Sequence, residues 1–290
     1  MSEPDSTFER RARLVTGVVA PTTVIAAMLF YFGYVSTTAE FAWFGVSIGS
    51  LDLSYQEVLL RSAGALYVPL GIVLVVSLVC LWIHAATRSA RASGNHTTAL
   101  KRLALGGIVV GTALFVRGII GVVVPDLARN EALATTPLCL GFGIVLIAYG
   151  RSVRQSLGVP VVVAGGARWV EVAARVAVAG IVVVALFWAS NSFAAAYGAG
   201  RGRAAAEQLE SRAAVVLDTT ERLYADYDGL AEEALPSHEG QVYKFRYHGL
   251  RLLIESNDRL FLVPVGWTAD EGAVLVVADD DRARMQLYRP

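Results

Sequence analysis

The sequence predicts a membrane protein with five helical crossings, followed by a small β-rich (α+β) domain at its C-terminal end. Of the 290 residues, 55% are hydrophobic and only 17% are charged, against about 25% charged in an average soluble domain. Apolar runs of about twenty residues, which is the length needed to cross a bilayer, recur along the first two thirds of the chain. After residue 196 the pattern changes to the short alternating segments typical of strands.

The apolar runs define a predicted transmembrane domain of residues 1–196. The first run follows a basic N-terminal segment and is longer than the apolar part of a cleaved signal peptide, so we expect it to be retained. Ser54–Glu57 matches a capping box that starts the second helix, and Pro69 lies inside that helix. The fourth run is long enough to cross only if it includes the residues from Leu133 onward. The five expected helices are at about 14–35, 63–86, 103–124, 133–150 and 173–196.

The distribution of basic residues predicts the orientation of these helices. Arg and Lys concentrate in residues 10–13, 87–102 and 151–175, which all lie on one side of a chain with five crossings. Because basic loops stay in the cytoplasm, the N-terminus is expected inside and the tail outside. The excess of Arg over Lys, with abundant Ala, Val and Gly, is typical of a GC-rich bacterium, so we expect a bacterial cytoplasmic membrane. Val159–Gly166 is apolar but too short to cross, and is expected as an interfacial loop.

The tail, residues 197–290, is expected to start with a glycine break at Gly198, Gly200 and Gly202, followed by a short helix-prone stretch. Ser256–Asp258 predicts the turn of a hairpin, and Asp279–Asp281 predicts a further turn. The expected strands are Val215–Leu217, Tyr243–Tyr247, Leu250–Glu255, Leu260–Val263, Ala273–Val277 and Met285–Tyr288. The candidate core residues are Phe245, Leu252, Ile254, Phe261, Val263, Trp267, Val274 and Val276. A ring-rich segment of Tyr31, Tyr34, Phe41, Trp43 and Phe44 is expected at the outer membrane interface.

Composition excludes several classes of function. The formal net charge is zero, which gives no argument for a nucleic-acid partner. Cys80 and Cys139 both lie in apolar runs, so the tail has no disulfide and must be held by its own core. The four His residues show no metal-ligand spacing. We therefore expect no cofactor, no metal and no catalytic residue, and the lipid bilayer as the first partner of the chain.

Three stretches carry a resemblance to known sequences. The segment LDLSYQEVLLRS at residues 51–62 resembles a recurring segment of uncharacterised multi-pass membrane proteins in actinobacteria. The tail stretches YHGLRLLIESNDRLFLVPVGW and VADDDRARMQLYRP are similar to theirs too. The resemblance implies the arrangement of helices followed by an extracytoplasmic β-rich domain, and it implies no activity.

Arg117 is the most informative single residue, because it lies inside the third apolar run. A charged side chain there costs about 2.5–3.5 kcal/mol on insertion scales, so it is expected to face protein or water and to have a partner. The functional alternatives are an anion or lipid-headgroup site or part of a permeation path. The structural alternatives are an arginine that snorkels outward or one that fixes an outer loop to the bundle. The candidate partners are Glu40, Asp52, Glu57, Asp126 and Glu131.

Four further motifs occur in the sequence. Gly107 and Gly111 form a GxxxG pattern, which predicts close helix packing. Gly45–Gly49 matches G-x-S-x-G around Ser47, but a nucleophile elbow needs a strand, a sharp turn and a helix. Asp279–Asp281 has the oxygen ligands for a hard cation, although an acidic turn explains it as well. Asn95–Thr97 is a glycosylation sequon on the expected inner side, and we discount it.

The sequence therefore favours a non-enzymatic membrane protein that displays residues 197–290 for contact with an envelope or membrane protein. A channel or transporter component that uses Arg117 is the first alternative. An envelope enzyme that uses Ser47 or the Asp triplet is the second.

Overall fold

The computed structural model describes residues 5–92, 97–124, 126, 131–158, 168–270 and 272–289, with side chains from residue 22 onward. The expected loop at Val159–Gly166 and the sequon at Asn95 lie outside them.

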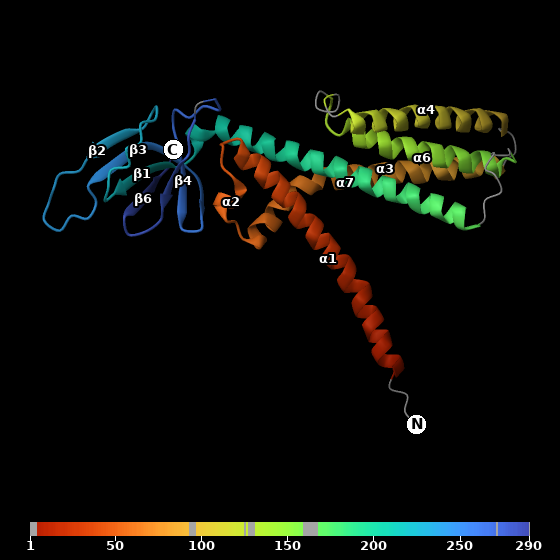
Figure 1. Cartoon of the computed structure of the whole chain (residues 1–290), viewed down its shortest axis with the longest axis horizontal. Helices are drawn as coiled ribbons and strands as arrows, with labels where there is room; N and C mark the ends of the chain where they lie inside the picture. The colour runs from red at the N-terminus through yellow and green to blue at the C-terminus, as the bar shows by residue number, and fades with distance from the viewer. Residues whose placement is uncertain are drawn as a thin grey trace. The chain divides into compact units, whose positions relative to one another are not determined.

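The chain divides into two compact units, residues 1–65 with 194–290, and residues 66–193. The helices are α1 (Asp5–Ala42), α2 (Ile48–Leu51), α3 (Tyr55–Ala92), α4 (Thr97–Val123), α6 (Thr135–Ser156) and α7 (Arg168–Glu207) (Figure 1). A 3₁₀ turn at Leu209–Ser211 precedes strands β1 (Ala214–Thr219), β2 (Ala231–Ala234), β3 (Phe245–Ser256), β4 (Arg259–Pro264), β5 (Leu275–Ala278) and β6 (Ala283–Tyr288).

Among the described residues, five helices are long and apolar enough to cross a membrane, which confirms the predicted number. They are α1, α3, α4, α6 and α7. The fourth, α6, has 22 residues, so at 1.5 Å per residue it reaches the thickness of a hydrocarbon core of about 30 Å. The capping box also forms: the Ser54 amide donates to Glu57 Oε2 at 2.9 Å, and the Glu57 amide donates to Ser54 Oγ at 3.3 Å.

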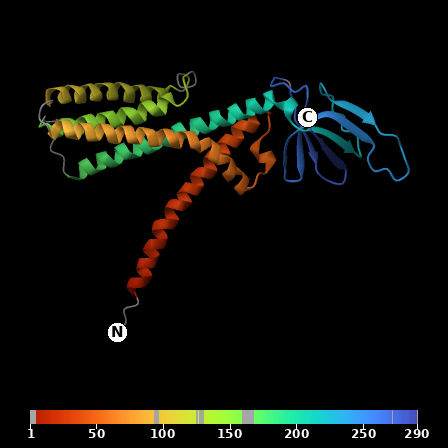
Figure 2. The same ribbon diagram turned by 180° about the vertical axis from the view of Figure 1, so that it is seen from behind.

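The helices α4 and α6 lie side by side in both views of the fold (Figures 1 and 2). Gly111 packs against Gly143, since a Cβ on Gly111 would come within 2.8 Å of the Gly143 carbonyl oxygen. A Cβ on Gly150 would come within 2.7 Å of the Ala104 carbonyl oxygen. Backbones that approach this closely replace side-chain contacts with backbone van der Waals contact, which drives helix association in lipid.

The spacing of this contact differs from the predicted GxxxG. A Cβ on Gly107 would meet nothing within 4 Å, so Gly107 does not pack as expected. Its partner in the motif, Gly111, belongs instead to a seven-residue repeat of small residues. The repeat consists of Ala104, Gly111 and Gly118 on α4, and of Thr136, Gly143 and Gly150 on α6, all of them buried.

The predicted glycine break is wrong, because α7 continues through Gly198, Gly200 and Gly202 to Glu207. Two of these glycines allow α7 to approach α1. A Cβ on Gly198 would overlap the Ser36 carbonyl oxygen, and one on Gly202 would come within 2.5 Å of the Glu40 carbonyl oxygen. The stretch is therefore a helix-packing surface, and the boundary predicted at residue 196 falls inside a continuous helix.

The sheet is antiparallel, with the order β5-β4-β3-β1-β6 and with β2 paired to one end of β3. The end strands β5 and β6 are joined by residues 279–282 only. A flat sheet of five strands would separate them by about 19 Å, whereas this connection reaches at most about 18 Å when fully extended. It is folded as a turn, with the Ala283 amide bonded to the Asp280 carbonyl. The sheet therefore curls, and Val277 and Ala283 share one core.

Three details of the sheet differ from the sequence prediction. Two expected strands merge into β3, because Gly249 adopts a φ of +85° and continues the strand through an irregularity. The strand β2 was not expected, and its four residues are all exposed. Val276 is half exposed on the end strand β5, so it is not a core residue, and Val277 is buried in its place. The predicted hairpin turn is confirmed, with Asn257 and Asp258 both at positive φ.

The strand β4 is buried on both faces. One face contributes Leu260 and Leu262 to the core inside the curl, with Tyr247 and Leu250. The other face contributes to a second apolar cluster that joins the sheet to the end of α1 and to α2. This anchor cluster contains Phe41, Phe44, Val46, Leu51, Leu209, Phe261 and Val263. Phe41 and Phe44, expected at the membrane interface, are thus buried against the sheet.

We predict that Gly111→Ala lowers the thermal stability of the purified protein, whereas Gly107→Ala on the same helix does not. The added methyl group at position 111 must displace the α6 backbone, and such overpacking costs about 1–3 kcal/mol. At position 107 the methyl group meets open space, and Ala is the better helix former by up to about 1 kcal/mol. Unfolding in detergent measures both variants. Equal melting temperatures for the two would contradict the seven-residue packing repeat.

Candidate functional site

Arg117 is paired with Glu131, one of the five carboxylates expected as its partner. The Arg117 side chain is 34% exposed and that of Glu131 is 15% exposed. Three of the other candidates have different neighbours. Glu57 caps α3, Asp52 accepts a hydrogen bond from Asn257, and Glu40 binds two other arginines. The pair therefore connects Arg117, near the C-terminal end of α4, to Glu131 in the segment that precedes α6.

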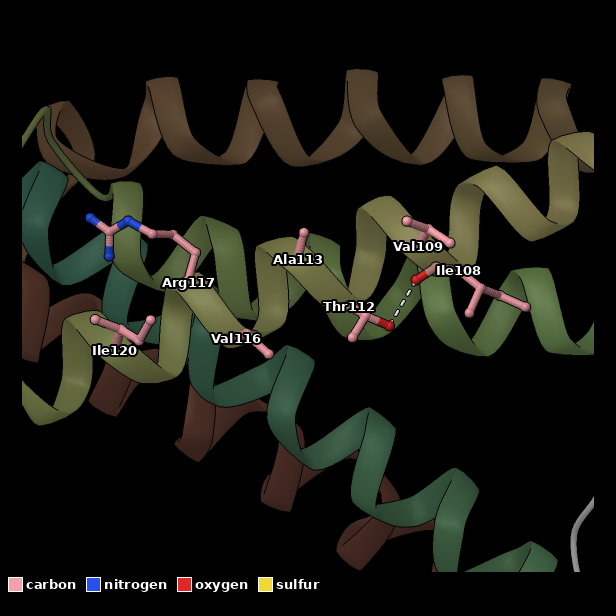
Figure 3. A pocket seen from close by; sticks show the side chains of 7 residues that line it. All are labelled: Ile108, Val109, Thr112, Ala113, Val116, Arg117 and Ile120. Carbon is pink, nitrogen blue, oxygen red and sulfur yellow. Dashed lines mark hydrogen bonds between the residues drawn. The ribbon is translucent and has the colours of Figure 1, made fainter.

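Arg117 also lies at one end of a hollow of about 610 Å³ on α4 (Figure 3). All seven lining residues belong to this one helix, and Arg117 is the single charged one among them. Thr112 is polar, but its hydroxyl donates to the Ile108 carbonyl at 2.8 Å, as Figure 3 shows. The hollow is therefore an open apolar surface of α4. It provides no row of polar groups for an ion or a solute.

A second buried charge, which sequence reasoning did not single out as a site, joins three helix ends. Glu40 on α1 is 8% exposed. Its carboxylate lies 3.6 Å from Arg61 on α3 and 3.3 Å from Arg201 on α7. Because Arg61 and Arg201 carry two positive charges against one negative, this Glu40 cluster has a net positive charge. The sequence contains a signal for this cluster, because Glu40 is the acidic residue closest to the end of the first apolar run.

Further polar residues are buried in the same region. Ser36, Thr37 and Ser62 are each at most 2% exposed. The Ser62 hydroxyl donates to the Leu59 carbonyl at 2.6 Å, whereas Thr37 Oγ1 has no hydrogen-bond partner among the described residues. Removing polar groups from water without full pairing costs free energy. Because the Ser62 hydrogen bond lies within α3, burial of these polar groups adds little net stability.

The sheet contains a third charged group. Asp218 on β1 is completely buried and lies between its two cross-strand neighbours, Arg246 on β3 and Arg284 on β6. Arg246 binds the carboxylate through two hydrogen bonds of 2.7 and 3.1 Å, and Arg284 binds it through one of 2.7 Å. Arg246, and after it Arg284, lower the pKa of Asp218 below its ordinary value, against the opposing effect of burial. This Asp218 rung connects three adjacent strands.

The remaining sequence motifs are not assembled into sites. Ser47 lies between the turn after α1 and the four-residue α2, so a helix and a turn precede it where a nucleophile elbow needs a strand. His248 lies 3.6 Å from Glu233. Asp280 pairs with Arg282, as expected for an acidic turn. Among the described residues, no group of three or more His, Cys, Asp and Glu is placed to hold a metal ion.

We predict that Arg117→Leu and Glu131→Leu each destabilise the protein by about 1–3 kcal/mol, because each leaves a partly buried charge without its partner. The double variant, which removes both charges, is expected to lose less than either single variant. Thermal unfolding in detergent measures the four proteins. Arg175→Leu is the control, because the Arg175–Glu171 pair is exposed and is expected to contribute at most a few tenths of a kcal/mol. Additive losses in the double variant would contradict the pairing.

We also predict that Asp218→Asn costs about 3–5 kcal/mol at neutral pH, as for a buried ion pair that loses one partner. The folded-state pKa of Asp218 is lowered, so its contribution is complete above the ordinary value of 3.8 and is lost as pH falls through the lower, folded-state value. The stability difference between wild type and variant is therefore expected to be constant from pH 7 to about pH 4 and to shrink below it. Asp280→Asn, in an exposed turn, is the control. A difference that does not change with pH would contradict this account.

Comparison of the chain with protein-family models, with curated proteins and with solved structures finds no match.

Proposed function

We propose that this is an integral protein of a bacterial cytoplasmic membrane that crosses it five times and displays its C-terminal sheet outside as a non-enzymatic interaction domain. The observation that carries the proposal is the anchor cluster, which packs the sheet against the end of α1 and against α2. This packing fixes the sheet to the helices, which supports its presentation to a partner. The resemblance to actinobacterial multi-pass membrane proteins agrees with this arrangement.

The course of the helices supports the orientation. The end of α1, the start of α3 and the end of α7 meet within one unit, through Gly33 against Val58 and Gly198 against Ser36. If these three ends lie on one side of the membrane and the chain crosses it five times, the basic segments lie on the other side. These segments are residues 10–13, 87–102 and 151–175. The rule that basic loops remain in the cytoplasm then favours an external sheet.

The two alternatives have less support. A channel or transporter needs a polar path, whereas Arg117 pairs with Glu131 and borders an apolar surface of α4. An envelope hydrolase needs a nucleophile with a base beside it, and the segment around Ser47 lacks the strand that a nucleophile elbow requires. The proposed partner is an envelope or membrane protein that contacts residues 197–290.

We predict that a photo-crosslinking amino acid at Tyr224 forms discrete protein adducts in intact cells. Tyr224 lies in the connection between β1 and β2, and its side chain is 81% exposed. The same amino acid at Tyr67 on α3, which is 82% exposed in an apolar helix, is the control and is expected to label lipid. Immunoblotting of the full-length protein measures the adducts. An absence of protein adducts from Tyr224 would contradict an interaction function.

Reporter fusions provide the topology control for the same experiment. Alkaline phosphatase, which is active outside the cytoplasm, is expected to be inactive after Gly94 and Ser156 and active after Pro290. An inactive fusion at Pro290 would place the sheet inside and reverse the proposed orientation.

A further inference from the structure

The curled sheet has an open edge at β5. Within the described strands, β5 pairs with β4 on one side, and its other side is the end of the sheet. Leu275 and Val277 point into the core, whereas Val276 and Ala278 are exposed. Unpaired backbone groups on such an edge form a template for another extended segment.

A notch of about 220 Å³ lies along this edge. One wall is formed by residues 276–278 of β5, and the other by Thr219, Thr220 and Ala283, where β1 ends and β6 begins. Leu223 adds an apolar side chain. The Leu223 amide donates to the hydroxyl of the buried Tyr247 at 2.8 Å, which fixes this part of the wall. The notch thus combines a free strand edge with space for one apolar side chain.

The rim of the notch is acidic. Glu221 and Asp280 line it, and Asp279 and Asp281 flank Asp280 as exposed residues. Arg282 is the one base in the lining, and it is already bound to Asp280. Residues 197–290 as a whole contain sixteen acidic and eleven basic residues, which is a net negative charge.

The charge decides between possible occupants of the edge. Pairing of β5 with β5 of a second copy would bring two acidic rims together, and like charges in close contact disfavour that arrangement. An acidic segment is repelled for the same reason. A segment that carries Lys or Arg beside apolar residues is attracted to the rim and can also fill the notch.

We infer that the notch beside β5 binds an extended, basic segment of a partner protein by strand addition. Main-chain hydrogen bonds to the free edge of β5 hold the segment, an apolar side chain enters the notch, and Lys or Arg side chains pair with Glu221 and with Asp279–Asp281. This inference rests on the proposed interaction function and names the chemistry of the partner at that surface.

Binding of defined peptides to the full-length protein in nanodiscs of phosphatidylcholine tests the inference. The probe is a fluorescein-labelled heptapeptide of alternating lysine and valine. One comparison peptide has glutamate in place of lysine, and the other has proline in place of the central valine. Fluorescence anisotropy at low salt is expected to show at least tenfold tighter binding of the lysine–valine peptide than of either comparison peptide, and weaker binding at high salt.

Variants of the protein locate the site. Glu221→Gln combined with Asp281→Asn is expected to weaken binding of the lysine–valine peptide at least threefold. Glu239→Gln changes an exposed acid in the connection between β2 and β3, away from the notch, and is expected to have no effect. Equal losses in both variants would show general electrostatic attraction and would overturn the inference. Equal binding of the proline peptide would overturn strand addition, and an absence of peptide binding would overturn the site.

The crosslinking experiment separates this inference from the proposed function. If Tyr224 forms protein adducts in cells and the Glu221→Gln, Asp281→Asn variant forms the same adducts, the interaction function stands and the basic segment at β5 is wrong. If Tyr224 forms no adducts, the proposed function itself fails.

Discussion

The anchor cluster is the interaction on which the rest of this unit depends. Phe261 and Val263 are completely buried on one face of β4, against Phe44 and Leu51 from the segment between α1 and α3. Each fully buried side chain of this size contributes about 1.5–3 kcal/mol relative to exposure. Because the other face of β4 forms the core of the curl, β4 connects the sheet's own core to the helical part of the unit. The sheet therefore depends on the segment from Phe41 to Leu51 to bury one face of β4.

The Glu40 cluster adds specificity to this attachment. Glycines at positions 198 and 202 bring the backbones of α7 and α1 together, and Glu40 then reaches both Arg201 and Arg61. The net worth of such ion pairs is small after desolvation. Their geometric demand is high, since a rotation of α1 would separate the buried Glu40 carboxylate from both arginines. Apolar burial thus holds the sheet in place, and the charges determine which helix faces meet.

The sequence predicts those parts of the structure that depend on neighbouring residues alone. Five helices followed from apolar length, and the hairpin at Asn257 and Asp258 followed from turn chemistry. The contact partners of charged and small residues depend on which helices pack together. A local sequence pattern carries no information about that packing. Hence Gly111 packs while Gly107 does not, Gly198 packs inside a helix where the sequence predicts a break, and Glu131 is one of five candidate partners for Arg117. Val276 is exposed and Val277 is buried because they lie on opposite faces of β5, and Val277 is on the face that packs into the core of the curl.

Biogenesis is affected by the pairing of Arg117 with Glu131. In a membrane, α4 alone would carry an uncompensated guanidinium, at a cost of about 2.5–3.5 kcal/mol. The carboxylate that neutralises it follows fourteen residues later in the chain, and at about 5–20 residues per second it is synthesised roughly one to three seconds afterwards. The backbones of α4 and α6 also pack against each other. Both contacts favour insertion of the two helices into the bilayer together, as a hairpin, once both have been synthesised.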